Sequence, residues 1–305
     1  MKKDVVNLSA SVRQRLLNLA RERKEDFGFV LSRYGLERFL YRLSASPHRD
    51  LFVLKGALLL QVWTGETYRP TRDLDLLGKG TPNLSYQKIF LDVLSQDVED
   101  DGLSFLSETI RVEPIRDEEA YEGVRVLLEA RLGNVRIPLQ IDVGFGDAVV
   151  PAPAELEFPT LLKFPAPKLK AYSKESVVAE KFEAIVKLGM ANSRMKDFYD
   201  LWVLAQRFEF ESSTLTAAIR ATFATRETVL PISLPLALQP NFYRVPTRQT
   251  QWKAFLRKSG LNVESSLEET IGVIRELVMP IVEGISRISR GDREKMIWEA
   301  GGPWK

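Results

Sequence analysis

The sequence contains no cysteine and only one histidine, and both absences narrow the chemistry open to the protein. Without cysteine the chain can form neither a disulfide nor a thiolate metal site, which is usual for a cytoplasmic protein. The single histidine, His48, lies in the polar stretch Ser46-Pro47-His48-Arg49, which is typical of a loop. Mechanisms that need histidine as a base or as a zinc ligand, including those of many metal-independent ribonucleases, are therefore disfavoured.

Long hydrophobic runs are also missing. No stretch approaches the roughly 18 consecutive apolar residues of a membrane helix. The N-terminus begins Met1-Lys2-Lys3-Asp4 and continues with polar sequence instead of the apolar core of a signal peptide. With 305 residues, of which 45% are apolar, the chain is long enough for a substantial core and for two domains. We expect a cytoplasmic protein that does not contact the membrane.

The net charge is only +2, but the charges are distributed unevenly. Residues 1–50 carry 11 basic and 6 acidic side chains, whereas residues 51–160 carry 10 basic and 19 acidic ones. Residues 161–204 and 205–305 are each basic by 3 charges. An acidic block between basic segments suits a metal centre that works on nucleotide or nucleic-acid phosphate, although an uneven surface without function explains it equally well.

The acidic block contains the stretch Arg69-Pro70-Thr71-Arg72-Asp73-Leu74-Asp75-Leu76-Leu77. Its alternation predicts a strand with one buried face and with Asp73 and Asp75 side by side on the other. Two like charges on one face repel each other, and a divalent cation removes that repulsion. Oxygen ligands favour Mg²⁺ or Mn²⁺, so the pair is a candidate metal site; a solvated strand edge is the alternative.

A candidate phosphate contact precedes these aspartates. An apolar strand over residues 51–54 ends at Lys55-Gly56-Ala57, and residues 58–63 continue as a buried helix that ends near Gly65. A glycine at the start of a helix lets backbone N–H groups approach a phosphate, and Lys55 adds a positive charge. A phosphate-binding turn followed by a strand that carries carboxylates would form a coherent nucleotide site.

Strands are predicted over residues 105–116, 121–132 and 135–145, with Gly133-Asn134 as a hairpin turn. In the last of them Asp142 alternates with Ile141 and Val143, so its side chain projects away from the packed face. Asp142 is a candidate third metal carboxylate or a general base. Before these strands, residues 10–26 and 28–45 are predicted helices whose arginines, among them Arg33, Arg38 and Arg42, are placed mostly on outer faces.

The proline-rich residues 150–171 indicate a boundary, and we predict domains at residues 1–165 and 166–305. In the mainly helical second part, Lys181 lies on an apolar helix face and needs an anionic partner. Asp197 and Asp200, three residues apart on the next helix, share a face. Each could take part in a salt bridge with a cation in the core. Residues 291–305 are predicted to be a loosely held tail.

Five motifs, taken in order, resemble those of the AbiEii/AbiGii toxin family, which includes MenT-like proteins. They are Leu54-Lys55-Gly56-Ala57, Arg69-Pro70-Thr71-Arg72-Asp73-Leu74-Asp75, Ile141-Asp142-Val143, Val178-Ala179-Glu180-Lys181-Phe182-Glu183-Ala184 and Asn192-Ser193-Arg194-Met195-Lys196-Asp197-Phe198-Tyr199-Asp200-Leu201. The resemblance spans about residues 50–205.

This resemblance implies an α+β fold, with a DNA-polymerase-β-like nucleotidyltransferase core of mixed sheet and helices followed by a helical C-terminal domain. It implies the toxin of a type IV toxin–antitoxin system, with a cognate antitoxin encoded nearby, which moves a nucleoside monophosphate from an NTP onto RNA. The expected acceptor is the tRNA 3′ end, so that translation is blocked.

The site residues implied by the resemblance fall into three groups. Asp73 and Asp75, with Asp142 as the third carboxylate, would hold Mg²⁺ or Mn²⁺. Lys181 would neutralise phosphate charge and Asp197 would act as a catalytic or positioning acid. The NTP would be bound by Lys55, Gly56, Ala57, Arg69, Thr71 and Arg194.

Position 57 departs from the pattern of the wider superfamily, because it is alanine where glycine or serine is usual. Two alternatives therefore stay open beside nucleotidyl transfer. One is a nucleotide-dependent phosphotransferase, or kinase, with the same metal site, and the other is a module that binds nucleotide without turnover.

Overall fold

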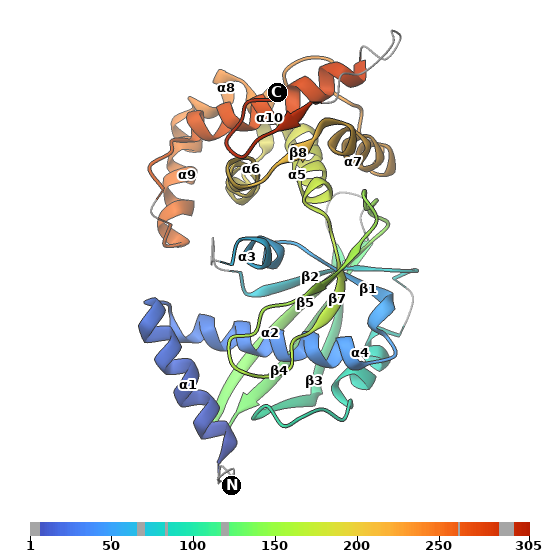
Figure 1. Ribbon diagram of the computed structural model, residues 1–305, viewed down its shortest axis with the longest axis vertical. Helices are drawn as coiled ribbons and strands as arrows, with labels where there is room; N and C mark the ends of the chain where they lie inside the picture. The colour runs from blue at the N-terminus through green and yellow to red at the C-terminus, as the bar shows by residue number, and fades with distance from the viewer. Residues whose placement is uncertain (1–6, 66–70, 83–84, 117–121, 262, 287–295) are drawn as a thin grey trace. The chain divides into compact units, whose positions relative to one another are not determined.

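The computed structural model describes residues 7–65, 71–82, 85–116, 122–261, 263–286 and 296–305 (Figure 1). The chain forms two compact units. The first comprises Met1–Val62, Pro70–Gly146 and Ala154–Ala171, and the second comprises Trp63–Arg69, Asp147–Pro153 and Tyr172–Lys305.

The first unit is built on a mixed sheet, which in the described residues has seven strands in the order β3-β4-β5-β2-β1-β7-β6. The strands are β1 (Phe52–Lys55), β2 (Asp73–Gly78), β3 (Leu103–Arg116), β4 (Glu122–Leu132), β5 (Val135–Phe145), β6 (Ala154–Glu157) and β7 (Lys168–Ala171). The central strand β2 runs antiparallel to β1 and parallel to β5. The predicted strands are confirmed, and β4 and β5 are joined by a two-residue turn in which Gly133 has a positive φ of 60°.

Four helices accompany this sheet within the described residues: α1 (Leu8–Arg23), α2 (Phe27–Ala45), α3 (Leu58–Thr64) and α4 (Tyr86–Leu94). The α2 helix begins at a capping carboxylate, because Asp26 Oδ1 accepts a hydrogen bond from the Phe29 backbone N–H at 2.9 Å. It then packs closely on β5: a Cβ added at Gly35 would lie 2.9 Å from Leu139 Cδ2. The α2 helix therefore covers one face of the strand that carries Asp142.

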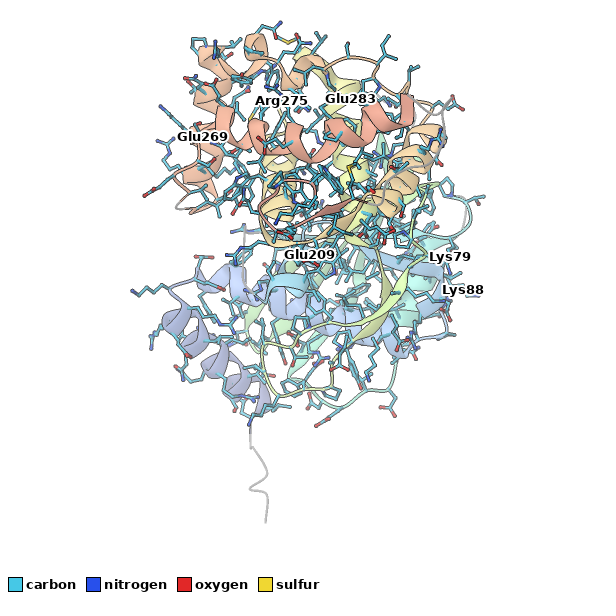
Figure 2. The ribbon with its side chains drawn as sticks, turned by 45° about the horizontal axis from the view of Figure 1, so that its top comes forward. Lys79, Lys88, Glu209, Glu269, Arg275 and Glu283 are labelled. Atoms are coloured by element: carbon cyan, nitrogen blue, oxygen red, sulfur yellow. The ribbon has the colours of Figure 1, made fainter. Side chains whose placement is uncertain are left out.

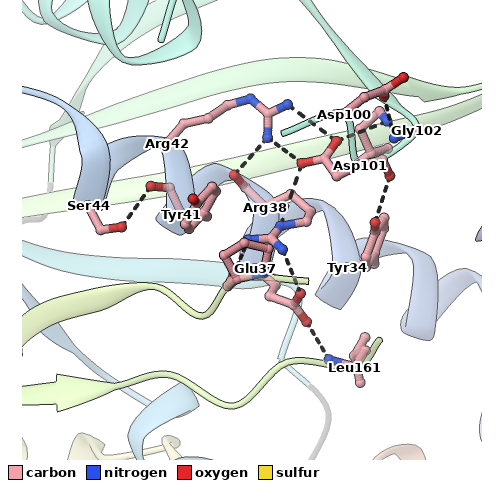
Figure 3. A network of polar contacts seen from close by, with 12 residues as sticks. Tyr34, Glu37, Arg38, Tyr41, Arg42, Ser44, Asp100, Asp101, Gly102 and Leu161 are labelled. Carbon is pink, nitrogen blue, oxygen red and sulfur yellow. Dashed lines mark hydrogen bonds and ion pairs between the residues drawn. The ribbon is translucent and has the colours of Figure 1, made fainter. Parts of the chain in front are cut away.

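The α2 helix buries arginines that were predicted to face outward. Arg33, Arg38 and Arg42 are at most 7% exposed. Arg42 donates to Asp101 Oδ2 at 2.6 Å, and Arg38 lies 3.6 Å from the same oxygen (Figure 3). The prediction of an outer basic face on α2 is wrong, because Glu25 pairs with Arg33, and Asp101 with backbone carbonyls supplies partners for the other two guanidinium groups.

Glu37 is buried in the same network and fixes the loop before β7 to α2. Its Oε2 accepts a hydrogen bond from the Leu161 backbone N–H at 2.7 Å, while Arg38 donates to the Pro165 carbonyl at 2.7 Å (Figure 3). Burial raises the pKa of Glu37 to about 7, against the lowering effect of the Leu161 hydrogen bond and of Arg38. The polar network thus joins α2 to this loop beside the ring contact of Tyr34 with Phe164, whose centroids are 6.2 Å apart.

The second unit is mainly helical, as predicted. It contains α5 (Lys174–Leu188), α6 (Met195–Arg207), α7 (Ser212–Thr225), α8 (Pro240–Tyr243), α9 (Pro246–Lys258) and α10 (Leu267–Ser286), with a small sheet of β8 (Phe210–Glu211) and β9 (Ile297–Trp298). In neither unit does the described chain contain a helix with both the length and the apolar character needed to span a bilayer.

Residues 296–305 are held firmly, contrary to the predicted loose tail; residues 291–295 of that prediction lie outside the described residues. Trp298 is fully buried, and its indole N–H donates to the Ala205 carbonyl at 2.8 Å. Phe210 and Trp298 are register partners in the small sheet. The C-terminus therefore completes the core of the helical unit.

Replacing Asp101 by asparagine should lower the free energy of unfolding by about 3 kcal/mol, because the buried Arg42 and Arg38 then lose the negative charge of Asp101. Urea denaturation monitored by circular dichroism measures the change. The exposed Asp97→Asn variant serves as the matched control and should change stability by less than about 0.5 kcal/mol. Equal stability of the two variants would refute a stabilising role for the Asp101 pairs.

Candidate functional site

Strand β2 presents its two aspartates on one face, as predicted. Asp73 and Asp75 are half-buried, while Leu74 and Leu76 between and beyond them are fully buried. The leucines hold the strand in the core, so the carboxylates cannot turn inward. The alternation in the sequence therefore places both carboxylates together at the centre of the sheet.

A row of four charged residues crosses the sheet at Asp75. Lys55 on β1 is the register partner of Asp75, Asp75 is the partner of Asp142 on β5, and Asp142 is the partner of Arg125 on β4. Register partners point to the same face of a sheet. The structure therefore brings together the predicted residues Lys55, Asp75 and Asp142, with a cation at each end of a carboxylate pair.

Gly56 lies directly against the carboxylate of Asp75. Its φ is +80°, and a Cβ added there would lie 2.1 Å from Asp75 Oδ2. Both the backbone conformation and the close approach require glycine at this position. The helix α3 begins two residues later at Leu58, so the turn Lys55-Gly56-Ala57 and the Asp75 carboxylate form one compact surface.

Asp142 is engaged by side chains that sequence reasoning missed. Arg125 Nε and Nη2 donate to Asp142 Oδ1 and Oδ2, each at 2.8 Å, and Gln140 Nε2 lies 3.1 Å from Oδ2. The hydrogen bonds to Asp142, together with the charges of Asp142 and Asp73, raise the pKa of Arg125. The pair could have been found from the sequence, because counting outward from the Gly133 turn along both strands of the hairpin places Arg125 opposite Asp142.

The donor set of Asp73 and Asp75 consists of oxygen only and fits Mg²⁺ or Mn²⁺. Within the described part of the chain, no group of three or more histidine, cysteine, aspartate or glutamate side chains is arranged so that it could hold a metal ion. Asp142 could join Asp73 and Asp75 only after Arg125 turns away. Its assignment as third metal ligand stays a prediction.

Three further predicted nucleotide contacts have different outcomes. Thr71 is half-buried, and its hydroxyl lies 3.4 Å from the Asp73 carbonyl oxygen, next to the carboxylate strand. Ala57 follows Gly56 in the turn before α3. Arg69 lies outside the described residues.

In the second unit, Lys181 has the anionic partners that its apolar helix face requires. Its Nζ lies 2.8 Å from Asp197 Oδ1 and 2.8 Å from Asp200 Oδ2, and both aspartates are buried. Arg194, half of whose side chain is exposed, donates from Nε to Asp197 Oδ2 at 2.6 Å. Lys181, Asp197 and Arg194 thus form one cluster with Asp200, which was predicted only as a core residue.

The charges of this cluster balance. Burial acts to raise the pKa of Asp197, but the charges of Lys181 and Arg194 hold that pKa below its usual value. Asp197 is therefore ionised at neutral pH, and the contacts from Lys181 to Asp197 and Asp200 fix the orientation of the ammonium group. The second unit thus holds a positioned ammonium next to an exposed guanidinium.

Replacing Arg125 by methionine should strengthen Mn²⁺ binding in the absence of nucleotide by roughly 10-fold, because Asp142 loses its competing cation and becomes available as a ligand. Electron paramagnetic resonance of Mn²⁺ measures the affinity directly. Arg131→Met, which removes an exposed guanidinium from the same strand, is the matched control. Unchanged or weaker Mn²⁺ binding by the Arg125 variant would contradict this interpretation of the pair.

The search against curated proteins finds no match. Two solved structures from Helicobacter pylori match, each at 14% identity over 83% of this chain. One is a candidate nucleotidyltransferase, of which 95% is covered at a TM-score of 0.43, and the other is JHP933, of which 91% is covered at a TM-score of 0.44.

A family model matches residues 38–272, well over half of the chain, and it describes the nucleotidyl transferase AbiEii toxin of type IV toxin–antitoxin systems. The mixed sheet and the helical C-terminal part agree with the α+β nucleotidyltransferase fold that the sequence predicted. This chain belongs to the AbiEii nucleotidyltransferase toxin family.

Proposed function

We propose that this protein is a toxin that transfers a nucleoside monophosphate from an NTP to RNA in a metal-dependent reaction. The proposed acceptor is the 3′ end of tRNA, so that translation is blocked, and the proposed setting is the cytoplasm, with a cognate antitoxin as partner. Family membership supports the reaction class. The main support for the proposal is the close contact between Gly56, which has no Cβ, and the Asp75 carboxylate. Asp73 lies on the same face of the strand as Asp75.

In this proposal Asp73 and Asp75 hold Mg²⁺ or Mn²⁺, with Asp142 as the third carboxylate once Arg125 has moved. A bound divalent cation would stabilise negative charge on the attacked phosphoryl group and on the departing pyrophosphate. The absence of a Cβ at Gly56 leaves room for the Asp75 carboxylate against the turn, and Lys55 supplies a positive charge there. Ala57, Thr71 and Arg69 are the further proposed contacts to the triphosphate.

Lys181, Asp197 and Arg194 are proposed to act on the same substrate. Lys181 neutralises phosphate charge, and Asp197 positions it through the 2.8 Å contact between the lysine Nζ and the aspartate Oδ1. Arg194 is held by Asp197 and half-exposed, so it can also contact phosphate. Positioned cations of this kind stabilise charge that develops in the transition state.

The proposed step conserves atoms and charge. The RNA hydroxyl oxygen attacks the α-phosphorus, the bond from that phosphorus to the β-phosphate oxygen breaks, and pyrophosphate leaves. The hydroxyl proton passes to a carboxylate, for which Asp142 is suited by its place beside Asp75. A phosphotransferase would instead release nucleoside diphosphate, and a binding module would release neither product.

Incubation with unfractionated tRNA, Mg²⁺ and each of the four labelled NTPs should give labelled RNA and an equal amount of pyrophosphate. Asp73→Asn and Lys181→Met should each lower the rate at least about 100-fold, because the first removes a ligand of the proposed cation and the second removes a positive charge that acts on phosphate. Asp97→Asn is the control, because Asp97 is an exposed carboxylate away from β2. Release of nucleoside diphosphate, or no incorporation with any NTP by folded protein, would contradict the proposal.

A further inference from the structure

The two neighbouring helices near the end of the second unit have opposite charge. Helix α9 carries four basic residues and no acidic one, namely Arg248, Lys253, Arg257 and Lys258. Helix α10 carries four glutamates and one arginine. Glu269, Arg275 and Glu283 lie along it in Figure 2. Although the whole chain has a net charge of only +2, the charged residues of α9 are all basic.

Helix α9 is fixed to α6 by aromatic rings on its inner side. Trp252 is buried, and the rings of Trp252 and Phe255 both pack against Tyr199 of α6, with centroids 6.5 Å and 5.7 Å away. Lys253 and Arg257 lie four residues apart on the opposite, exposed side. The aromatic contacts hold this exposed side in one orientation.

The basic side chains on this side repel one another without compensation from the protein. Lys253 and Arg257 are like charges at positions i and i+4, which destabilises a helix by a few tenths of a kcal/mol. In the described ranges, neither Lys253, Arg257 nor Lys258 forms an ion pair. Arg257 and Lys258 complement the dipole of the last turn, but Lys253 lies before that turn and Arg248 lies in the first turns, where a cation is unfavourable.

Helix α9 also contacts the segment that leads into the Lys181 cluster of the second unit. Arg248 of α9 donates to the Met190 carbonyl, four residues before Arg194, which in turn binds Asp197. Lys196 is exposed one turn before Tyr199, the residue that contacts α9. Exposed cations of α6 and α9 therefore lie on two helices that pack against each other, and α6 also carries the aspartates that bind Lys181.

We propose that the α9 basic surface, formed by Arg194, Lys196, Arg248, Lys253, Arg257 and Lys258, binds the phosphate backbone of the RNA acceptor. The inference depends on the proposed function for the identity of the polyanion. Cations spread along 13 helical residues suit a chain of phosphates better than a single anion. The surface then holds the body of the RNA acceptor.

The chemistry of the exposed side favours RNA over a protein partner. Besides the cations it presents Thr247, Gln249, Thr250, Gln251 and Ala254, all exposed. Hydroxyl and amide groups donate hydrogen bonds to phosphate and sugar oxygens. A stable protein interface needs buried aromatic or apolar anchors, whereas the aromatic residues of α9 pack inward.

The test compares Lys253→Gln/Arg257→Gln with Arg220→Gln/Arg275→Gln, which removes two exposed helical cations elsewhere in the same unit. Fluorescence anisotropy with labelled unfractionated tRNA, without NTP or metal, gives the affinity at several salt concentrations. The α9 variant should bind roughly 10-fold more weakly, and the slope of log K against log salt should become shallower by about 1 to 2. The control should change the affinity less than about 2-fold.

The outcome separates this surface from the proposed reaction. Equal RNA affinity of the α9 variant and its control overturns the inference, even if the wild-type protein transfers nucleotides. Weakened RNA binding by the α9 variant alone supports the surface, even if no nucleotide is transferred. Loss of antitoxin binding with unchanged RNA binding would assign the surface to a protein partner and overturn the inference.

Discussion

Two carboxylates lie side by side at the centre of the sheet, because Asp75 on β2 and Asp142 on β5 are register partners. Like charges placed in this way repel, and the leucines on either side of Asp75 prevent β2 from turning them apart. The cations Lys55 and Arg125 at the ends of the row offset the repulsion when no metal is bound. The rest of the proposed site depends on this constraint, since a divalent cation can replace these neighbours.

The second unit also places two aspartates close together, and there cationic side chains of the same unit offset the repulsion. Asp197 and Asp200 are buried together, and Lys181 joins them through one ammonium group. Arg194 adds a second cation that is partly exposed, so the cluster presents this guanidinium outward while Lys181 stays mostly buried. The two clusters therefore differ: Lys181 and Arg194 have partners that persist, whereas the Arg125 contact must break if Asp142 is to bind a metal.

Local sequence patterns predicted the elements whose packing is set by alternation and turns. The β2 strand followed from Asp73-Leu74-Asp75-Leu76, and the β4–β5 hairpin followed from Gly133-Asn134. The inward orientation of Arg38 and Arg42 on α2 could not be predicted. Their partner Asp101 is distant in sequence, and only the tertiary structure brings it close. Predicting the Arg125 contact would have required the register of the strands, and predicting the fixed C-terminus would have required knowing that Trp298 is buried. Roles of site residues stay predictions, since they concern substrates.

The central claim is that the carboxylates of β2 bind nucleotide through a divalent cation. Titration calorimetry with an NTP analogue that has a methylene group between the α- and β-phosphates measures this without turnover. The wild-type protein should bind the analogue at least about 10-fold more tightly with Mg²⁺ than with EDTA, and Asp75→Asn should abolish the difference. Equal affinity with and without Mg²⁺, or a full metal effect in the Asp75 variant, would contradict the claim.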